Sequence, residues 1–250
     1  MMPDTLYDMI FKRKSFHLFQ NTGKISAEEL MAIENRVTML RPLYPEIRTA
    51  VKIVPAEKTT CRRGEEYCIL FYSEQKDGYL QNIGYLGEQL DLYLASVDIG
   101  ALWFGIGKPE EDVLEGLAFV IMIGIAKMPS DKFRKDMFKS KRKPIEEIWN
   151  GQLLPGITHI VRFAPSACNT QPWKVEADGD VLWIWRYKKP GKRGIMPAAK
   201  VVYYNRIDIG IFLLFLELCL EKEGKCYTRT LFSDPGDERE MTLFAQYKIR

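Results

Sequence analysis

Two prolines in the second half of the chain enclose a short stretch that is rich in polar side chains. They are Pro165 and Pro172, within the sequence APSACNTQPW at residues 164–173. Four side chains between them donate or accept hydrogen bonds: Ser166, Asn169, Thr170 and Gln171. Because proline interrupts helices, this backbone holds at most about one helical turn and keeps amide groups for other partners. The small Ala167 lets a ligand approach closely, which predicts a site for a flat ligand with polar groups along one edge. An ordinary capping turn is the alternative, since Ser and Asn beside proline are common in turns.

A second candidate site is the sequence Arg13-Lys14-Ser15, which follows the apolar end of a short predicted helix. Two cations and a hydroxyl group can hold a phosphate through charge-assisted hydrogen bonds. The alternative is a solvated surface cluster. The basic stretch Lys139–Lys143 is interpreted as a solvated linker, because no aromatic residues alternate with its cations as base stacking would require.

Composition excludes several other classes of function. The net charge of +3 comes from 36 basic and 33 acidic residues, so no strong positive field favours nucleic acid. Five cysteines without a Cys-x-x-Cys spacing, and only two histidines, indicate neither a disulfide framework nor a zinc site, and we expect no metal. The chain begins without the pattern of a signal peptide, and its most apolar run, Ile209–Leu216, is too short to span a bilayer. We therefore expect a cytoplasmic protein that does not bind membranes.

The elements that would position these residues follow from hydrophobic periodicity. A capping box at Ser26–Glu29 predicts a helix to about Leu40, and Tyr67–Tyr72 is typical of a buried strand. A helix through Val97 is predicted to end with Gly100 at its C-terminal cap. The run Leu117–Ile125 is apolar on both faces, as expected of a central strand.

The second half of the chain repeats this outline. Asp178-Gly179 predicts a hairpin turn, and a helix from about Asp208 is predicted to end at Gly224. The glycines that end the two long helices lie 124 positions apart, which predicts two related halves. The polar stretch Asp131–Lys143 is the expected linker or crossover between them.

Together these stretches resemble the FMN-dependent nitroreductase family. The resemblance covers most of the chain and consists of four features: Arg13-Lys14-Ser15 after a first helix, Pro165–Trp173 as a Pro-Ser-x-x-Asn-x-Gln-Pro-Trp turn, a long helix ending at Gly100, and a basic tail at Lys141-Arg142-Lys143-Pro144. It implies an α+β nitroreductase-like fold, in which helices flank a central, mainly antiparallel sheet. It also implies that a flavin, rather than a catalytic side chain, carries the chemistry.

The order of these features departs from the family. The Pro-Ser turn lies about 150 residues after Arg13 and also follows the basic tail, which normally ends the chain. The corresponding place in the first half, residues 40–54, keeps prolines but lacks the Ser, Asn and Gln. Because family members are homodimers with flavin at the interface, we interpret the chain as a fused pseudo-dimer of residues 1–143 and 144–250. One composite flavin site is expected, with phosphate contacts from the first half and ring contacts from the second, and its symmetry-related counterpart is expected to have decayed.

The resemblance assigns cofactor-binding roles to individual residues. The phosphate would be bound by Arg13, Ser15 and Arg142, with Lys14 and Lys141 as supporting cations. The Pro-Ser turn would contact the ring through Pro165, Ser166, Ala167, Asn169 and Gln171. His17 stands where the family often has a Lys or Arg near flavin N1 and O2, so it would tune the flavin with only a partial charge. A packed histidine at a helix end is the alternative.

The implied function is that of an FMN-dependent NAD(P)H oxidoreductase. In a ping-pong reaction, NADH or NADPH would reduce the flavin at N5, and a nitroaromatic, quinone or similar planar acceptor would reoxidise it. Two alternatives stay open at this point: a flavin-binding sensor or reservoir without physiological turnover, and a relic that binds no flavin. The fused chain is expected to be a monomer, with further dimerisation left open.

Overall fold

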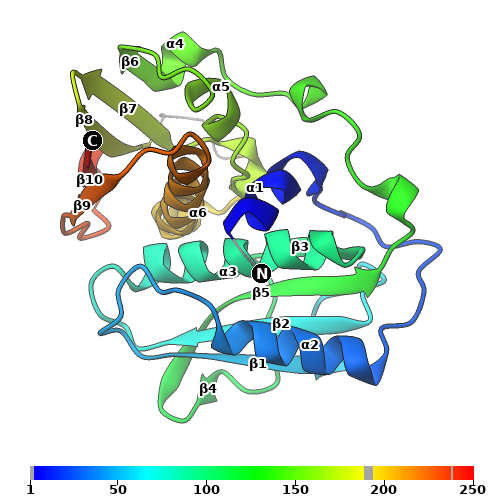
Figure 1. Ribbon diagram of the computed structural model, residues 1–250. Coiled ribbons are helices and arrows are strands. Elements are labelled where there is room, and N and C mark those ends of the chain that lie inside the picture. Colours follow the sequence, from blue (N-terminus) through cyan, green and yellow to red (C-terminus); the bar gives the residue numbers. More distant parts are fainter. Residues whose placement is uncertain (1–2, 189–193, 238) are drawn as a thin grey trace.

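The computed structural model describes residues 3–188, 194–237 and 239–250, and its strands form two five-stranded sheets. Two long helices, α3 (Tyr79–Ser96) and α6 (Val201–Lys222), pack against each other between the sheets (Figure 1). The largest cluster of buried apolar side chains includes residues of both helices and both sheets. The two sheets therefore share one core.

The first sheet has the order β1 (Thr49–Pro55), β2 (Tyr67–Ser73), β5 (Leu117–Lys127), β3 (Ile99–Phe104), and β4 (Val113–Leu114) pairs with β5. All of its pairings are antiparallel. Strand β5 is central and buried over most of its length, as its apolar sequence predicted.

The second sheet has the order β6 (Trp149–Gly151), β7 (Trp173–Asp178), β8 (Val181–Tyr187), β10 (Met241–Ile249), β9 (Tyr227–Leu231). The short β6 is parallel to β7, and the other pairs are antiparallel. Apart from the added strands β4 and β6, the two sheets have the same order. In each, the third strand along the chain lies at an edge, and the long helix connects the second strand to the third.

The remaining helices are shorter. They are α1 (Pro3–Lys12), α2 (Ala27–Thr38), α4 (Ile145–Ile148) and α5 (Thr158–Val161). Five 3-10 turns complete the described structure: Ala56–Lys58, Ser130–Lys132, Met137–Lys139, Ala167–Asn169 and Ala198–Lys200. Between β5 and β6 the chain crosses from the first sheet to the second, passing the C-terminal end of α1, where Arg134 N donates to Lys12 O at 3.0 Å.

Most predicted elements are confirmed. Both hydrogen bonds of the Ser26–Glu29 capping box are present, at 2.9 and 3.1 Å. The strand at Tyr67–Tyr72 and the hairpin turn at Asp178-Gly179 form as expected. Gly224 follows α6 with a φ of +67°, as predicted for a glycine that ends a helix.

Three expectations about the elements are wrong. Gly100 does not end α3, because Asp98 takes the left-handed conformation with a φ of 58° and Gly100 lies in β3. A Cβ atom on Gly100 would come within 2.5 Å of Met128, so this glycine is needed for packing. Helix α6 begins at Val201, seven residues before the predicted start at Asp208. The described strands form two sheets, whereas one central sheet was expected.

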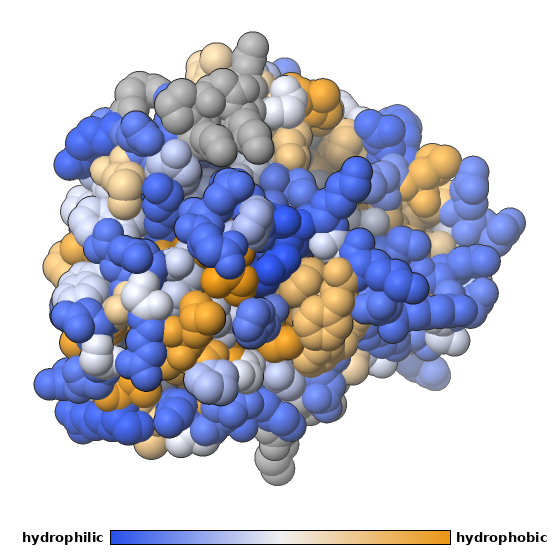
Figure 2. All heavy atoms as spheres, turned by 90° about the horizontal axis from the view of Figure 1, so that it is seen from above, coloured by the Kyte–Doolittle hydropathy of each residue, from blue (hydrophilic) through white to orange (hydrophobic). Residues whose placement is uncertain are grey.

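The surface seen from above is largely hydrophilic, with separate hydrophobic patches (Figure 2). Within the described residues, no helix is both long and apolar enough to cross a membrane.

Candidate functional site

Residues from both predicted sites line one cavity of about 550 Å³. Four parts of the chain come together at this cavity. They are the segment after α1, the end of β3, the turn before β7, and the chain crossing, which is the segment between β5 and β6. Nine of the predicted cofactor-binding residues line it: Arg13, Lys14, Ser15, His17, Arg142, Pro165, Ser166, Ala167 and Asn169. Its volume is typical of small-molecule sites, which measure about 300–1,000 Å³.

Arg13 lies at the wall of the cavity and is only 3% exposed. Its Nε and one terminal nitrogen each lie 2.8 Å from Asp91 Oδ2 on α3. Trp103 Nε1 donates to the same oxygen at 3.0 Å. Burial alone would lower the pKa of Arg13, but the neighbouring Asp91 and Glu88 outweigh it and raise that pKa. Arg13 is therefore always charged and is held in place by a salt bridge.

Glu88 is the second acid beside Arg13, and its side chain is fully buried. Its Oε1 lies 3.5 Å from Arg13 Nε, and neither carboxyl oxygen has a hydrogen-bond partner among the described residues. Burial raises the pKa of Glu88 well above its usual value, although Arg13 opposes the shift. Asp91 is therefore the acid that hydrogen-bonds to Arg13, and Glu88 lies beside this pair without a hydrogen bond to it.

Two further arginines, Arg134 and Arg142, reach the cavity from the chain crossing. Burial lowers the pKa of each to about 10, and repulsion from neighbouring arginines adds to the shift. The guanidinium group of Arg134 has no hydrogen bond or salt bridge within the described part of the chain. Cations that repel one another inside a cavity favour an anionic ligand, because its charge relieves the repulsion.

Arg142 also fixes the turn before β7. It donates to Asn169 Oδ1 at 3.2 Å and to Phe163 O at 3.0 Å. Its Nε is buried and has no partner within the residues described. The crossing segment is thereby attached to the second half of the chain at the cavity wall.

The turn itself has an unusual backbone. Cys168, Asn169 and Gln171 have φ values of 49°, 54° and 48°, a region that residues other than glycine seldom occupy. The strain is offset by internal hydrogen bonds, in which Ser166 Oγ accepts from Gln171 N at 2.9 Å and Gln171 Oε1 accepts from Lys143 N at 2.9 Å. Clustered strain of this kind is a feature of ligand sites.

Two predicted residues do not line the cavity. Gln171 is 3% exposed, and its side chain is occupied by the hydrogen bonds that hold the turn. Lys141 is exposed and contributes its backbone carbonyl, which accepts from Asn169 Nδ2 at 3.1 Å. For Gln171 the alternative interpretation as ordinary turn chemistry therefore fits the structure better.

Asp208 on α6 lines the cavity and was not predicted as a site residue. Its Oδ1 accepts from Ala167 N at 2.9 Å, and its buried Oδ2 has no partner among the described residues. Burial raises the pKa of Asp208 to about 8, although the hydrogen bond from Ala167 opposes the shift. At neutral pH this group mostly carries a proton. The sequence feature that could have indicated Asp208 is its position as a single carboxyl group within the apolar run that begins at Ile207.

The rest of the wall is apolar and aromatic. Trp103 and Phe104 at the end of β3 and Ile207 and Ile211 of α6 line the same cavity. Arg63 also lines it, with its guanidinium group 5.9 Å from the centre of the Phe104 ring. Trp173, the last residue of the predicted turn, is fully buried and stacks on Phe212.

The chain matches the model of a protein family described as "Putative TM nitroreductase" over residues 5–219. Among solved structures, a "putative nitroreductase" from Thermotoga maritima has a TM-score of 0.62 and 20% sequence identity, covering 98% of this chain and 92% of that chain. This likeness shows a shared fold over nearly the whole length.

Two other solved structures match part of the chain. A "putative nitroreductase in complex with fmn" from Desulfovibrio desulfuricans has a TM-score of 0.44 and 14% identity, covering 60% of this chain and 98% of that chain. A "Putative NADH dehydrogenase/NAD(P)H nitroreductase" from Parabacteroides distasonis has a TM-score of 0.44 and 12% identity, covering 59% and 98%. No curated protein matches this chain.

Proposed function

Because the chain belongs to the nitroreductase family whose model it matches over residues 5–219, we propose that its cavity binds FMN and that it works as an NAD(P)H oxidoreductase. Membership makes the protein an oxidoreductase enzyme of the nitroreductase type. The proposed electron donor is NADH or NADPH. The proposed acceptors are nitroaromatics, quinones and similar planar molecules, which suit the aromatic wall formed by Trp103 and Phe104.

The residues of the cavity fit FMN in charge and in shape. Arg134 and Arg142 are cations whose mutual repulsion an incoming phosphate would relieve. Arg13 contributes less free charge than the sequence implied, because Asp91 already neutralises it. The apolar wall suits a flat ring, and the turn at Pro165–Asn169 lies at the same cavity to meet the polar edge of that ring.

A bound FMN would supply the redox chemistry, accepting hydride from NAD(P)H at N5 and passing it to an acceptor in a ping-pong cycle. The chain's own residues provide binding and proton control. Asp208 holds a proton on Oδ2 at the wall of the cavity near neutral pH. Lys14, His17 and Arg63 line the same cavity and would contribute positive charge or hydrogen-bond donors to a flavin bound there.

The observation that carries this proposal is the single cavity that combines Arg13–His17 with Pro165–Asn169, two segments about 150 residues apart. It supports one composite flavin site per chain. The experiment is to mix purified protein with FMN, remove free flavin on a desalting column, and quantify retained flavin from its absorbance. We expect about one FMN per chain.

Variants test the proposed phosphate site. Arg134→Gln and Arg142→Gln should each weaken FMN binding by about 10–100-fold, since each removes a charge-assisted hydrogen bond. Lys248→Gln, at an exposed position of β10, is the matched control and should bind FMN like the native chain. Retention of no flavin by the native chain, or equal affinity in all three variants, would refute the proposed site.

Steady oxidation of NADH or NADPH in the presence of a quinone would then support the enzymatic role. Tight FMN binding without such turnover would instead favour a flavin sensor or reservoir.

A further inference from the structure

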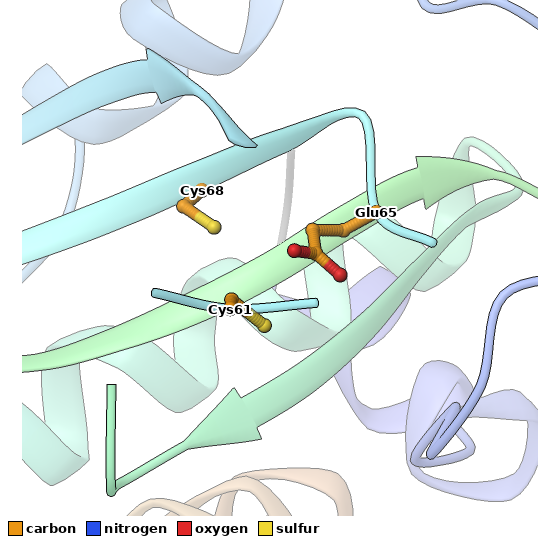
Figure 3. A group of neighbouring side chains, drawn as sticks. All are labelled: Cys61, Glu65 and Cys68. Carbon is orange, nitrogen blue, oxygen red and sulfur yellow. The ribbon is translucent and has the colours of Figure 1, made fainter. Parts of the chain in front are cut away.

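Three side chains that can bind a metal ion meet outside the cavity, where the loop before β2 passes the start of that strand. They are Cys61, Glu65 and Cys68, and all three are buried. One ligand atom from each, two Sγ atoms and a carboxylate oxygen, lie within 4.8 Å of one another. Figure 3 shows Cys68 on its strand, with Cys61 and Glu65 on the loop that passes close to it.

The sheet leaves room for this cluster at Gly124. Cys68 pairs with Gly124 across β2 and β5. A Cβ atom on Gly124 would already lie 3.4 Å from the Glu65 side chain and 3.6 Å from Cys61 Sγ. A larger side chain at this position would therefore occupy the space of the cluster.

Hydrogen bonds hold the Cys61 backbone and the Cys68 and Glu65 side chains. Thr59 Oγ1 accepts from Cys61 N at 3.1 Å and lies 3.5 Å from Cys68 Sγ. Arg63 N donates to Glu65 Oε2 at 2.7 Å. Groups of this kind, which hold potential ligands in place, are typical partners of metal ligands.

The charge of Glu65 is not balanced by another side chain. Within the described residues Glu65 forms no salt bridge, and the nearby Arg62 donates instead to the backbone carbonyls of Thr59 and Cys61. A buried carboxylate needs a partner, and a metal ion bound here would coordinate it directly.

We propose that Cys61, Glu65 and Cys68 bind one Zn²⁺ ion through two thiolates and a carboxylate. Zinc bonds of about 2.3 Å to sulfur and about 2.1 Å to oxygen in a tetrahedral site separate the ligand atoms by roughly 3.5–3.8 Å, so only a small contraction is needed. Two sulfur ligands exclude Mg²⁺ and Ca²⁺, and the carboxylate makes Cu⁺ a poor fit. Binding displaces the two thiol protons, and a water molecule completes the fourth position. The sequence spacing, Cys-x3-Glu-x2-Cys, did not indicate this site because the ligands converge only in the fold.

The metal would hold the loop that carries Arg63 to the cavity. Arg63 lies between two of the ligands, and its carbonyl accepts from Phe19 N at 2.7 Å. Gly64 adopts a φ of +87°, and a Cβ atom there would lie 2.5 Å from Phe19 O. This loop is thus packed against the segment that follows the Arg13–His17 site. The zinc site is independent of the proposed flavin and is tested without it.

The first experiment uses the full-length protein, purified under reducing conditions with Zn²⁺ and then desalted. Elemental analysis should find about one zinc per chain. Co²⁺ in place of Zn²⁺ should give the near-ultraviolet absorption of a thiolate–cobalt bond, and added Zn²⁺ should abolish it. Cleavage by trypsin after Arg62 and Arg63 should be slower with zinc than after chelation.

Variants identify the ligands. Cys61→Ser and Cys68→Ser should each weaken Zn²⁺ binding by more than about 100-fold, and Glu65→Gln by about tenfold or more. Cys226→Ser, at an exposed cysteine, is the control and should bind like the native chain.

Three outcomes would overturn the proposal. They are native protein without zinc or a cobalt band, unchanged zinc affinity in Cys61→Ser, and a Cys61–Cys68 disulfide in protein purified under reducing conditions. The native-chain measurements decide the question even if a serine variant fails to fold. Because the readouts are zinc content and cobalt absorption, a failure here leaves the flavin proposal unaffected.

Discussion

Asp208 shows how the fold changes the chemistry of a single side chain. It is enclosed by the apolar residues of α6, and only one of its two oxygens accepts a hydrogen bond. It has no salt bridge among the described residues, although Arg13, Arg134 and Arg142 line the same cavity. Burial without a paired cation keeps a carboxyl group neutral, so Asp208 can donate a hydrogen bond where most aspartates only accept.

The raised pKa of Asp208 gives a prediction about stability. An aspartate in the unfolded chain loses its proton near pH 4, whereas Asp208 in the folded protein keeps it up to about pH 8. Between these values the folded state binds one more proton, so the free energy of unfolding falls as the pH rises, by up to about 1.4 kcal/mol per pH unit. Asp208→Asn keeps the acceptor for Ala167 N and removes this dependence. Relative to the native protein, the variant should become more stable from pH 5 to pH 9.

Urea denaturation of the flavin-free protein at pH 5, 7 and 9 measures this difference. Asp180→Asn, at the exposed β7–β8 turn, is the control and should run parallel to the native profile. Parallel profiles for Asp208→Asn as well would mean that Asp208 is ionised in the folded state.

At the residue level, sequence could predict the parts of the site that form contiguous motifs. Residues 13–17 and 165–169 were found because each combines several polar groups in a short stretch, and both line the cavity. Arg134 and Asp208 were missed because each is a single charged residue, and its importance depends on burial beside other segments. The role of Gln171 toward the ligand stays a prediction, and its side chain makes hydrogen bonds to Lys143 N and Asn169 O that hold the turn.

At the scale of elements, the position of the cavity depends on how closely α3 and α6 approach. Gly84 of α3 faces the carbonyl of Ile207, and Gly210 of α6 faces the carbonyl of Gln81. A Cβ atom would lie 2.0 Å from the first oxygen and 1.9 Å from the second. The two helices therefore touch through their backbones, and neither glycine can gain a side chain unless the helices separate. Asp208 lies next to this contact, so separation would also move the cavity wall.

We predict that Gly84→Ala and Gly210→Ala each destabilise the protein by more than about 2 kcal/mol. Alanine favours a helix over glycine by about 1 kcal/mol, but a clash with backbone cannot be relieved by rotating a side chain, and overpacking of this kind outweighs that gain. Gly23→Ala is the control, because its Cβ atom would meet only the flexible Lys127 side chain, at 3.2 Å. Thermal and urea unfolding measure the effect, and a neutral result for Gly84→Ala would show that the helices are farther apart.

Sequence periodicity predicted the existence of both helices but not this contact. It placed the start of α6 too late because Asn205 and Arg206 interrupt the apolar pattern, although the buried side of the helix continues through Tyr204 and Val201. Gly100 was assigned to a helix end because glycine is common there, whereas its actual role is close packing in β3. The number of sheets was also beyond local patterns, since pairing between strands depends on the whole chain.

At the scale of the whole molecule, the helix contact supports the proposed fused dimer. Gly84 lies three residues after Gln81, whose carbonyl faces Gly210. In the same way, Gly210 lies three residues after Ile207, whose carbonyl faces Gly84. The two sides of the contact are therefore equivalent, with an offset of 126 residues. Asn82 and Asp208 have the same offset. Asn82 Oδ1 accepts from Leu43 N at 2.8 Å, as Asp208 Oδ1 accepts from Ala167 N at 2.9 Å. Such reciprocity is characteristic of twofold interfaces between identical subunits.

The equivalence also explains why one site is expected instead of two. Asn82 holds the proline-containing turn of the first half as Asp208 holds the turn of the second half. That first turn has Leu43 and Tyr44 where the second has polar and small residues, and Leu43 is buried in the core. Its role is therefore packing, in agreement with a decayed second site.

The fused-dimer proposal predicts that the chain can be divided and reassembled. Residues 1–143 and 144–250, produced together as separate chains, should purify as a one-to-one complex, because α3 and α6 bury their apolar surfaces against each other. Either segment alone should aggregate, since half of the shared core would be exposed to water. Contacts such as Arg142 with Asn169 would then join two chains across the cavity, and the complex should retain about one FMN.

The same pair of segments carrying Gly210→Ala should fail to assemble. Size-exclusion chromatography with flavin quantitation decides the matter, and a segment that stays folded and monomeric by itself would show that the two halves are independent domains.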